Sequence, residues 1–150
     1  MFLLFLQKKI IMQYRSTCPL SSFLDIIGDK WSLLIIRDLF IGRNTYSEFL
    51  KSPENISTNV LVDRVKKLIA MKIITFERDQ NDKKIKYYKL TKKGIDLFPI
   101  ITEMSLWSRN HLDMEFHPLA IETFNEIDQK GKLKHINDVV TSFNNELVNF

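Results

Sequence analysis

Residues 55–77, NISTNVLVDRVKKLIAMKIITFE, limit most narrowly what this chain can fold into. Their apolar residues recur at three- and four-residue spacings, which predicts one buried helix face: Val60, Leu61, Val65, Leu68 and Ile69. Ser57 precedes this run and is a favoured N-cap residue. The other face carries Thr58, Asn59, Asp63, Arg64, Lys66 and Lys67. Such a helix either enters a DNA major groove by its polar N-terminal end or is an ordinary amphipathic surface helix.

The residues before this stretch predict further helices. Ser21 or Ser22 can cap a short helix that is broken near Gly28, and KWSLLIIRDLF then forms a core helix that stops at Gly42. Thr45 caps the segment YSEFL, with Glu48 at the spacing of a capping box, and Pro53 forbids its continuation. Two helices joined by the turn at residues 52–55 make a helix-turn-helix.

A β-hairpin is predicted directly after the second helix. Residues 73–77 and 84–90 are rich in β-branched and aromatic side chains, and residues 78–83 form a polar turn between them. A hairpin in this position describes the wing of a winged helix. Its cations are suited to gripping phosphates or entering a minor groove: Arg78, Lys83, Lys84 and Lys86. Alternatively, the hairpin is simply solvated, and its cations only discourage edge-to-edge aggregation.

Charge is distributed unevenly along the 150 residues, which are enough for one domain with an appended helical piece. Residues 57–94 hold eleven Lys and Arg against four Asp and Glu, whereas residues 95–150 hold four against nine. The basic middle predicts salt-dependent attraction to polyanions. The single cysteine, Cys18, excludes a disulfide framework within the chain and fits a reducing compartment. We therefore expect a cytoplasmic protein.

The two ends of the chain are predicted to add helices to the helix-turn-helix and hairpin. Residues 1–17 lack the order of features found in a signal peptide and no run reaches membrane-span length, so we expect an N-terminal dimerisation helix, with Met1 or Met12 as the natural start. Thr91 can cap the next helix, over residues 92–112, which is kinked at Pro99 and has more apolar residues than one monomer needs. We infer a homodimer interface there. Residues 117–150 predict two acidic amphipathic helices that extend this interface, cover a sensor cavity or recruit a partner.

Four ordered segments together resemble the HxlR-type family of winged helix-turn-helix transcriptional regulators, which are relatives of the MarR regulators. The segments are Cys18-Pro19-Leu20, LDIIGDKWSLLIIRDL at 24–39, ISTNVLVDRVKKL at 56–68 and YKLTKKG at 88–94. The resemblance implies a mainly α fold with a small β-hairpin over residues 18–116, with extra N- and C-terminal helices outside it.

The same resemblance implies a function. Family members bind double-stranded operator DNA as homodimers, which implies a transcriptional repressor or other regulator that reads a palindromic site. By position, the recognition-helix candidates are Ser57, Thr58, Asn59 and Arg64, to which the cationic Lys67 is added from the helix pattern. Some members sense oxidants or electrophiles at the position of Cys18, which makes an oxidant or small-molecule signal an expectation here.

The chain departs from the family pattern in three places. Lys72 replaces a glycine after the reading helix, which predicts a less cleanly terminated helix. Val62 replaces a small polar residue, which removes one phosphate hydrogen bond. The chain also continues for some forty residues past the usual last helix.

An enzyme is not indicated. The sequence has no Gly-rich phosphate loop, nucleophile elbow or zinc motif, and we expect no cofactor. The spacing H-x-D-x-E-x-H from His111 to His117 does not place all four side chains on one helix face, so we expect no metal site. The alternative to a DNA-binding regulator is a winged-helix protein-interaction module without operator specificity.

Overall fold

The computed structural model describes residues 13–148, which contain eight helices and a two-stranded sheet. The elements are α1 (Pro19–Ile27), α2 (Ser32–Phe40), α3 (Tyr46–Leu50), α4 (Thr58–Ala70), β1 (Ile74–Arg78), β2 (Lys86–Leu90), α5 (Lys92–Ile95), α6 (Phe98–His111), α7 (Pro118–Lys130) and α8 (Lys132–Val148). This order confirms the predicted mainly α fold with one small hairpin. The helix expected within residues 1–17 falls mostly outside the described residues; residues 13–14 have no regular structure and residues 15–17 form bends.

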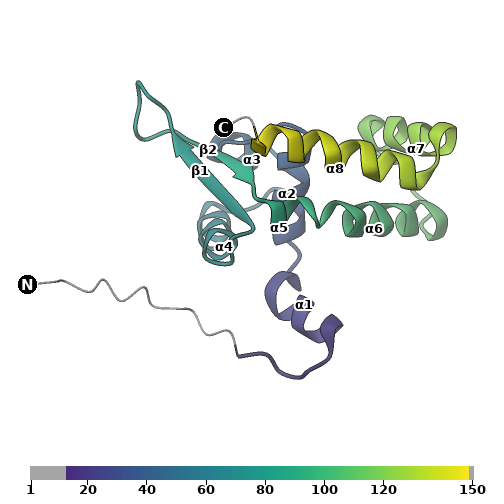
Figure 1. Cartoon of the computed structure of the whole chain (residues 1–150), viewed down its shortest axis with the longest axis horizontal. Coiled ribbons are helices and arrows are strands. Elements are labelled where there is room, and N and C mark those ends of the chain that lie inside the picture. Colours follow the sequence, from purple (N-terminus) through teal and green to yellow (C-terminus); the bar gives the residue numbers. More distant parts are fainter. Residues whose placement is uncertain (1–12, 149–150) are drawn as a thin grey trace, which may run out of the picture.

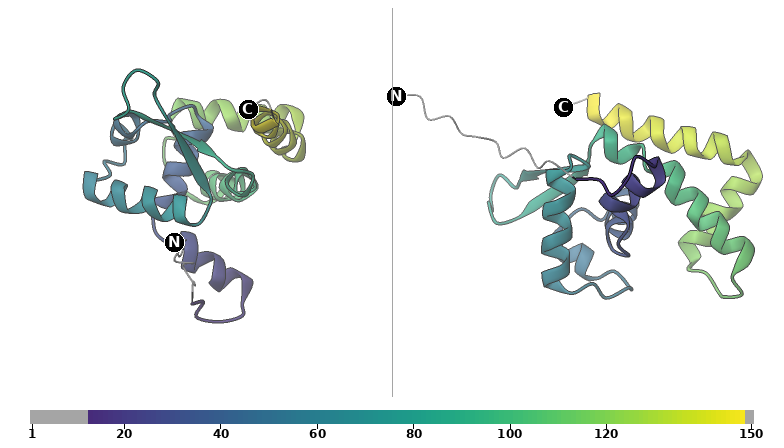
Figure 2. Two further views of the ribbon diagram at one scale, coloured as in Figure 1. Left: turned by 60° about the vertical axis from the view of Figure 1, so that its left-hand side comes forward. Right: turned by 90° about the horizontal axis from the view of Figure 1, so that it is seen from below.

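The molecule has two sides. Figure 1 shows α4 and the hairpin on one side and the layered helices α6, α7 and α8 on the other, with α2 and α5 between them. Helix α1 projects away from this body, and the two further views in Figure 2 agree. None of the helices in the described part of the chain has both the length and the apolarity that crossing a membrane requires.

Helix starts follow the predicted caps in three places. Thr45 accepts the Glu48 backbone N–H, and the Glu48 carboxylate accepts the Thr45 N–H, which completes the predicted capping box. Ser57 Oγ accepts the Val60 N–H at the start of α4. Thr91 Oγ1 accepts the Gly94 N–H at the start of α5. These three caps fix where the helix-turn-helix and the helix after the hairpin begin.

The predicted start of α1 was wrong. The helix begins at Pro19 with Cys18 as its N-cap residue, not at Ser21 or Ser22. Pro is favoured in the first turn because its missing N–H would have no partner there. The Ser22 hydroxyl instead donates to the Cys18 carbonyl oxygen.

Lys72 ends α4 cleanly, contrary to prediction. It adopts the left-handed conformation with φ 56°. The Ile73 N–H then bonds to the Leu68 carbonyl oxygen, and the Lys72 N–H to that of Ile69, both at 2.9 Å. This pair of bonds is a Schellman motif, which usually has glycine at the left-handed position. A lysine thus forms the turn that leads from α4 into β1.

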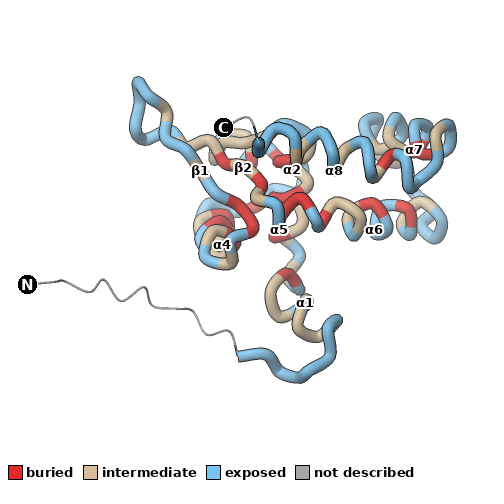
Figure 3. Tube along the Cα trace, viewed as in Figure 1, coloured by how far each residue is buried: buried red, intermediate tan, exposed pale blue. Residues whose placement is uncertain are grey.

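The hairpin pairs β1 and β2 antiparallel, with Ile74 opposite Leu90 and Arg78 opposite Lys86. Ile74, Tyr88 and Leu90 are buried at the end near the core, whereas the distal end is exposed. Figure 3 shows this change along the strands from buried to exposed. The hairpin therefore anchors one end in the core and extends its tip into solvent.

The core lies between α2, α3, α4, the hairpin and α5. Its fully buried members include Ile36, Phe49, Leu61, Leu68 and Ile95. Gly94 allows α5 to approach the chain after α4, because a Cβ there would lie 2.3 Å from the Ile73 carbonyl oxygen. The predicted kinked helix over residues 92–112 was wrong in detail. A turn at Asp96–Leu97 separates α5 from α6, and Pro99 lies in the first turn of α6.

The C-terminal helices pack against this core and against one another. Helix α8 contacts α5, α6 and α7. On its inner face, Val140 and Phe143 pack on the main core, where the Phe143 ring lies 4.9 Å from that of Phe40. A second small cluster between α6 and α7 is formed by Leu106, Phe124 and Ile127. The residues beyond 117 are thus part of the packed body.

Candidate nucleic-acid interface

A buried carboxylate fixes the turn of the helix-turn-helix. Asp38, 2% exposed at the end of α2, accepts hydrogen bonds from the Ser52 hydroxyl at 2.7 Å and from the Arg37 guanidinium at 2.8 Å. Arg43 also reaches Asp38 and Ser52, at 3.4 and 3.2 Å. Because a buried charge is tolerated only when paired, these contacts hold the turn firmly on α2.

Glu54, further along the turn, is held by the guanidinium of Arg37. Arg37 Nη1 and Nη2 donate to the two carboxylate oxygens of Glu54. Hydrogen bonding from Arg37 lowers the pKa of Glu54 to about 2. Asn55 follows with φ 57°, a left-handed conformation that Asn tolerates better than most residues. Together these contacts set the direction in which α4 leaves the turn.

The N-terminal end of α4 presents small polar side chains to solvent. Ser57, Thr58 and Asn59 are all exposed, whereas Leu61, Val65 and Leu68 are buried below them. The predicted division of this helix into an apolar and a polar face is confirmed. The first turn of a helix also presents backbone N–H groups without intrahelical partners, which favour anions. This end of α4 is therefore suited to a phosphate backbone or to base edges.

Two cations of α4 contact the region around α1. The Arg64 guanidinium is half-buried, with Nη1 3.6 Å from Asp29 Oδ2 and Nη2 3.7 Å from Asp63 Oδ2. Lys67 Nζ lies 3.4 Å from the Asp25 carbonyl oxygen. Neither contact was expected from the sequence, which placed both residues on the solvent face. The structure thus ties the middle of α4 to the segment that follows α1.

The Asp29 carboxylate, which contacts Arg64, is also held by hydrogen bonds from Trp31 and Ser32. Partial burial disfavours its charged form, but hydrogen bonds from the Ser32 hydroxyl and from the Trp31 and Ser32 backbone, together with Arg64, hold its pKa below the ordinary value. The same carboxylate therefore accepts two backbone N–H groups at the start of α2 and pairs with Arg64 of α4. Sequence reasoning missed it because Asp29 precedes Arg64 by 35 positions in the chain.

The hairpin tip is organised by Asp79. Its Oδ1 accepts the backbone N–H groups of Asn81 and Asp82, and its Oδ2 accepts the Tyr87 hydroxyl. These backbone hydrogen bonds, those of Asp82 and Asn81 first, lower the pKa of Asp79. The Arg78 guanidinium donates to the Lys83 carbonyl oxygen at 2.8 Å. The tip is therefore an ordered turn rather than a loose loop.

The predicted wing cations divide into two groups. Lys83 and Lys84 are exposed at the tip. Arg78 and Lys86 instead lie over the Phe76 ring, at 5.8 and 4.5 Å from its centroid. All four remain on the side of the molecule that also carries α4, away from α6, α7 and α8 (Figures 1 and 2). The structure thus brings the helix and wing residues selected from the sequence onto one side.

Cys18 lies apart from this side. It is exposed at the start of α1, where its backbone N–H donates to the Ser16 hydroxyl. Helix α1 also contains Asp25, whose carbonyl oxygen accepts from Lys67 of α4.

His111, at the end of α6, and His117 make ordinary structural contacts. His117 is the N-cap residue of α7, and its Nδ1 accepts the Leu119 N–H at 3.2 Å. His111 stacks against Trp107 with ring centroids 5.0 Å apart. Over residues 13–148, no three His, Cys, Asp or Glu side chains are grouped closely enough to hold a metal ion.

Comparison with known proteins gives consistent matches. A model of the HxlR-like helix-turn-helix family matches residues 26–116. YvaP of Bacillus subtilis, an uncharacterized HTH-type transcriptional regulator, is 32% identical over 109 residues that cover 70% of this chain and 98% of YvaP.

Solved structures match the same region. The crystal structure of PA1607 has a TM-score of 0.62 at 32% identity and covers 69% of this chain and 72% of its own. The redox regulator HypR in its oxidized form has a TM-score of 0.58 at 28% identity and covers 65% of this chain and all of its own (100%).

Proposed function

Because this chain belongs to the HxlR-like helix-turn-helix family of transcriptional regulators, which are not enzymes, we propose that it binds a palindromic DNA operator as a homodimer. The main support for this proposal is that α4 and the hairpin lie on the same side of the molecule. An exposed polar helix end and an exposed basic hairpin tip therefore face the same partner. The protein acts in the cytoplasm as a repressor.

The reading residues are at the start of α4. Ser57, Thr58 and Asn59 are short enough to let the helix end approach base edges in the major groove and long enough to hydrogen-bond there. Arg64 and Lys67 lie deeper along the helix. Their ties to Asp29 and Asp25 support a role in positioning α4 and in facing phosphates, rather than in reaching bases from an extended side chain.

The wing contributes affinity with little sequence preference. Lys83 and Lys84 at the tip neutralise phosphates, and each phosphate contact releases condensed counterions from the DNA. Arg78 and Lys86 support the tip from the Phe76 ring and add positive potential at the same place. The wing therefore sets the salt dependence of binding, while α4 sets the sequence.

The dimer is formed through apolar surfaces that one chain leaves uncovered. On α1, Leu20 is 66% exposed, and on α6, Met104 is 53% and Trp107 58% exposed. Helix α1 projects from the body, as an arm that grips a second subunit would (Figure 2). A two-fold axis would place two α4 helices about 34 Å apart, one turn of DNA.

Cys18 is the oxidant-responsive group. It is exposed and has no second cysteine in the chain, so a disulfide forms between Cys18 of two subunits or with a small thiol. In the first case two thiols lose two protons and two electrons to the oxidant as one S–S bond forms. The similarity to a redox regulator supports this role.

The test is selection of bound sequences from a random DNA pool, with and without the thiol oxidant diamide. A two-fold symmetric site supports the regulator, and its loss on oxidation, absent in Cys18→Ser, supports the sensor. A symmetric site that is indifferent to diamide would remove the sensor role alone. Recovery of no enriched sequence would instead favour a protein-interaction module that uses the basic α4 to meet an acidic partner.

A further inference from the structure

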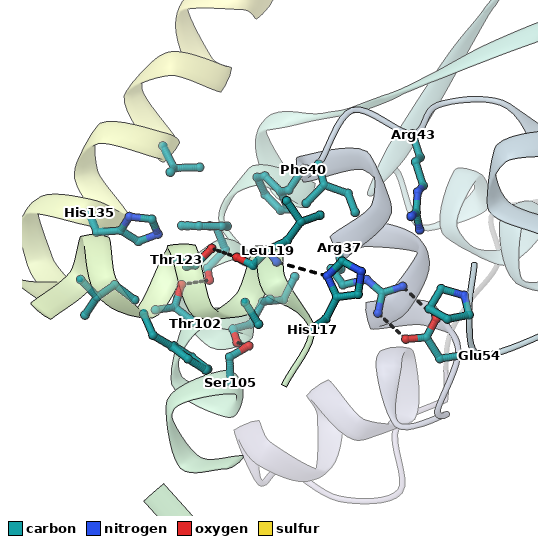
Figure 4. A pocket seen from close by; sticks show the side chains of 18 residues that line it. Arg37, Phe40, Arg43, Glu54, Thr102, Ser105, His117, Leu119, Thr123 and His135 are labelled. Carbon is teal, nitrogen blue, oxygen red and sulfur yellow. Dashed lines mark hydrogen bonds and ion pairs between the residues drawn. The ribbon is translucent and has the colours of Figure 1, made fainter. Parts of the chain in front are cut away.

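A cavity of about 380 Å³ lies between α2 and the helices α6, α7 and α8. Its wall is mainly apolar and includes Phe40, Phe98, Ile101, Leu119, Phe124 and Ile127 (Figure 4). Small-molecule sites in proteins typically have volumes of about 300–1,000 Å³ and mostly apolar walls with a few polar groups. Seven of the 18 wall residues belong to α7 and α8, which lie beyond the residues that match the family.

One buried polar side chain in this wall has no hydrogen-bond partner. His135, 4% exposed, projects from α8 into the cavity wall beside Phe98 (Figure 4). Neither ring nitrogen makes a hydrogen bond within the described residues, although Nδ1 lies 3.3 Å from the Glu126 carboxylate. A nearby carboxylate favours a proton on Nδ1, which leaves Nε2 as an unused acceptor. Buried polar groups without a partner are rare and call for a ligand or another explanation.

The hydroxyl groups of the wall are also acceptors, whereas His117, whose Nδ1 accepts the Leu119 N–H, offers an Nε2–H donor at the rim. The hydroxyls of Thr102, Ser105 and Thr123 donate to carbonyl oxygens of their own helices at 2.9–3.0 Å, so only their lone pairs face outward. The charged residues at the rim are already paired, Arg37 with Glu54 and Arg43 with Asp38. A ligand that matches this wall is therefore neutral, largely apolar and equipped with a hydrogen-bond donor.

We propose that this cavity is the effector site of the regulator and binds a small phenol-class molecule whose hydroxyl donates to His135 Nε2. The effector role rests on the proposed function. The position of the cavity supports the effector role, because Pro53 and Glu54 of the cavity wall belong to the turn that leads into α4. A ligand that displaces this turn changes the orientation of the reading helix.

The test compares two probes of almost equal shape, 4-propylphenol and 4-propylanisole, by calorimetric titration of the full chain without DNA. Only the phenol has an O–H donor, so it binds about fivefold more tightly, since one hydrogen bond is worth about 1 kcal/mol. His135→Phe removes the acceptor and brings the two affinities together. His111→Phe, outside the cavity, is the matched control and keeps the difference. Failure of the phenol to bind, or equal affinities of the two probes in the unchanged chain, would overturn the site.

A second measurement does not depend on the folding of a variant. In the unchanged protein, 4-propylphenol shifts the imidazole nitrogen resonances of His135 and leaves those of His111 in place. The reverse pattern would place the ligand elsewhere and overturn the site.

The effector role is tested separately. Saturating 4-propylphenol changes the affinity for the selected operator by fivefold or more, within the usual range of allosteric coupling. Binding of the phenol with unchanged operator affinity would overturn the effector role. Absence of any selected operator, with phenol binding intact, would instead count against the proposed DNA-binding function.

Discussion

The carboxylate of Glu54 accepts hydrogen bonds from both terminal nitrogens of Arg37, with Nη1–Oε1 at 2.5 Å and Nη2–Oε2 at 3.0 Å. This two-pronged contact joins the core helix α2 to the turn before α4. Arg37 simultaneously bonds Asp38 and Ser52, so one guanidinium fixes both ends of the turn. The orientation of α4, the proposed reading helix, thus depends on Arg37.

Glu54→Gln is expected to lower the free energy of unfolding by about 1 kcal/mol at pH 7. The full shift of the Glu54 pKa from 4.5 to about 2 would imply more, but its side chain is 33% exposed and solvent screens the pair. Because the folded-state pKa is depressed, this stability is complete above about pH 4.5 and is lost as pH falls toward 2.

Urea unfolding of both proteins at pH 7, 4 and 3 checks this expectation. The difference between them shrinks with falling pH. Glu122→Gln, on the exposed surface of α7, is the control and changes little. A difference that stayed constant across this pH range would mean that the Glu54 charge does not contribute through Arg37.

Arg64→Ala is expected to weaken operator binding by about tenfold, because the substitution removes a cation that faces phosphates in the proposed complex. Loss of the Asp29 contact also frees the middle of α4. Asp63→Asn is the matched variant on the same helix. Its carboxylate is 70% exposed, so removing that negative charge near phosphates strengthens binding slightly. Fluorescence anisotropy with labelled operator measures both; an unchanged Arg64→Ala affinity would contradict the assigned surface.

Lys84→Ala is expected to weaken binding to operator and unrelated DNA by the same factor. Loss of one phosphate contact also reduces the slope of log affinity against log salt by about 1. The measurement is a salt series from low to moderate ionic strength with both DNAs. Lys134→Ala on α8, distant from the hairpin, leaves the slope unchanged. A selective loss for the operator alone would mean that Lys84 reads sequence.

Lys72→Gly is expected to stabilise the protein by about 0.5 kcal/mol. The left-handed conformation costs a lysine about 1 kcal/mol, and glycine removes this cost while adding some entropy to the unfolded chain. Lys66→Gly is the control on the same helix, where the conformation is helical, and it destabilises by about 1 kcal/mol. Urea midpoints that moved in the same direction for both variants would contradict the assigned turn.

Gly94→Ala is expected to destabilise the protein by about 2 kcal/mol, because the added Cβ meets the Ile73 carbonyl oxygen at 2.3 Å and backbone must shift. Thermal unfolding followed by circular dichroism gives the change in midpoint. Asn125→Ala, on the exposed face of α7, tests an alanine placed in a helix without a clash. A Gly94→Ala protein as stable as the parent would show that α5 can move away from Ile73 at no cost.

The fold was predictable where one local signal dominates. Thr45 with Glu48, Ser57 and Thr91 each occur beside a clear apolar run, and all three caps form. At α1 the sequence offered several possible first residues. The helix starts at Pro19, whose fixed φ suits the first turn, and not after a serine cap. At residues 92–98 the break before Pro99 depends on how α5 packs on Ile73, which no local pattern contains.

The candidate site was predictable as a set of exposed side chains but not as a network. Periodicity identified Ser57, Thr58 and Asn59 at the solvent end of α4. The pairing of Arg64 with Asp29 depends on how two distant segments meet, and its partner lies 35 positions away. One signal was available: Arg37 and Asp38 interrupt an otherwise apolar core helix, which is where a buried ionic contact is expected.

The packing of Phe143 on Phe40 bears on how the protein is made. A ribosome releases α2, the helix-turn-helix and the hairpin before it has synthesised the part of α8 that covers Phe40. During that interval the apolar flank of α2 faces solvent or a chaperone, and the nascent domain is incomplete although all of the residues that we propose to face DNA have emerged. Completion of the regulator thus waits for α8, which delays the earliest moment at which a newborn chain can bind DNA stably.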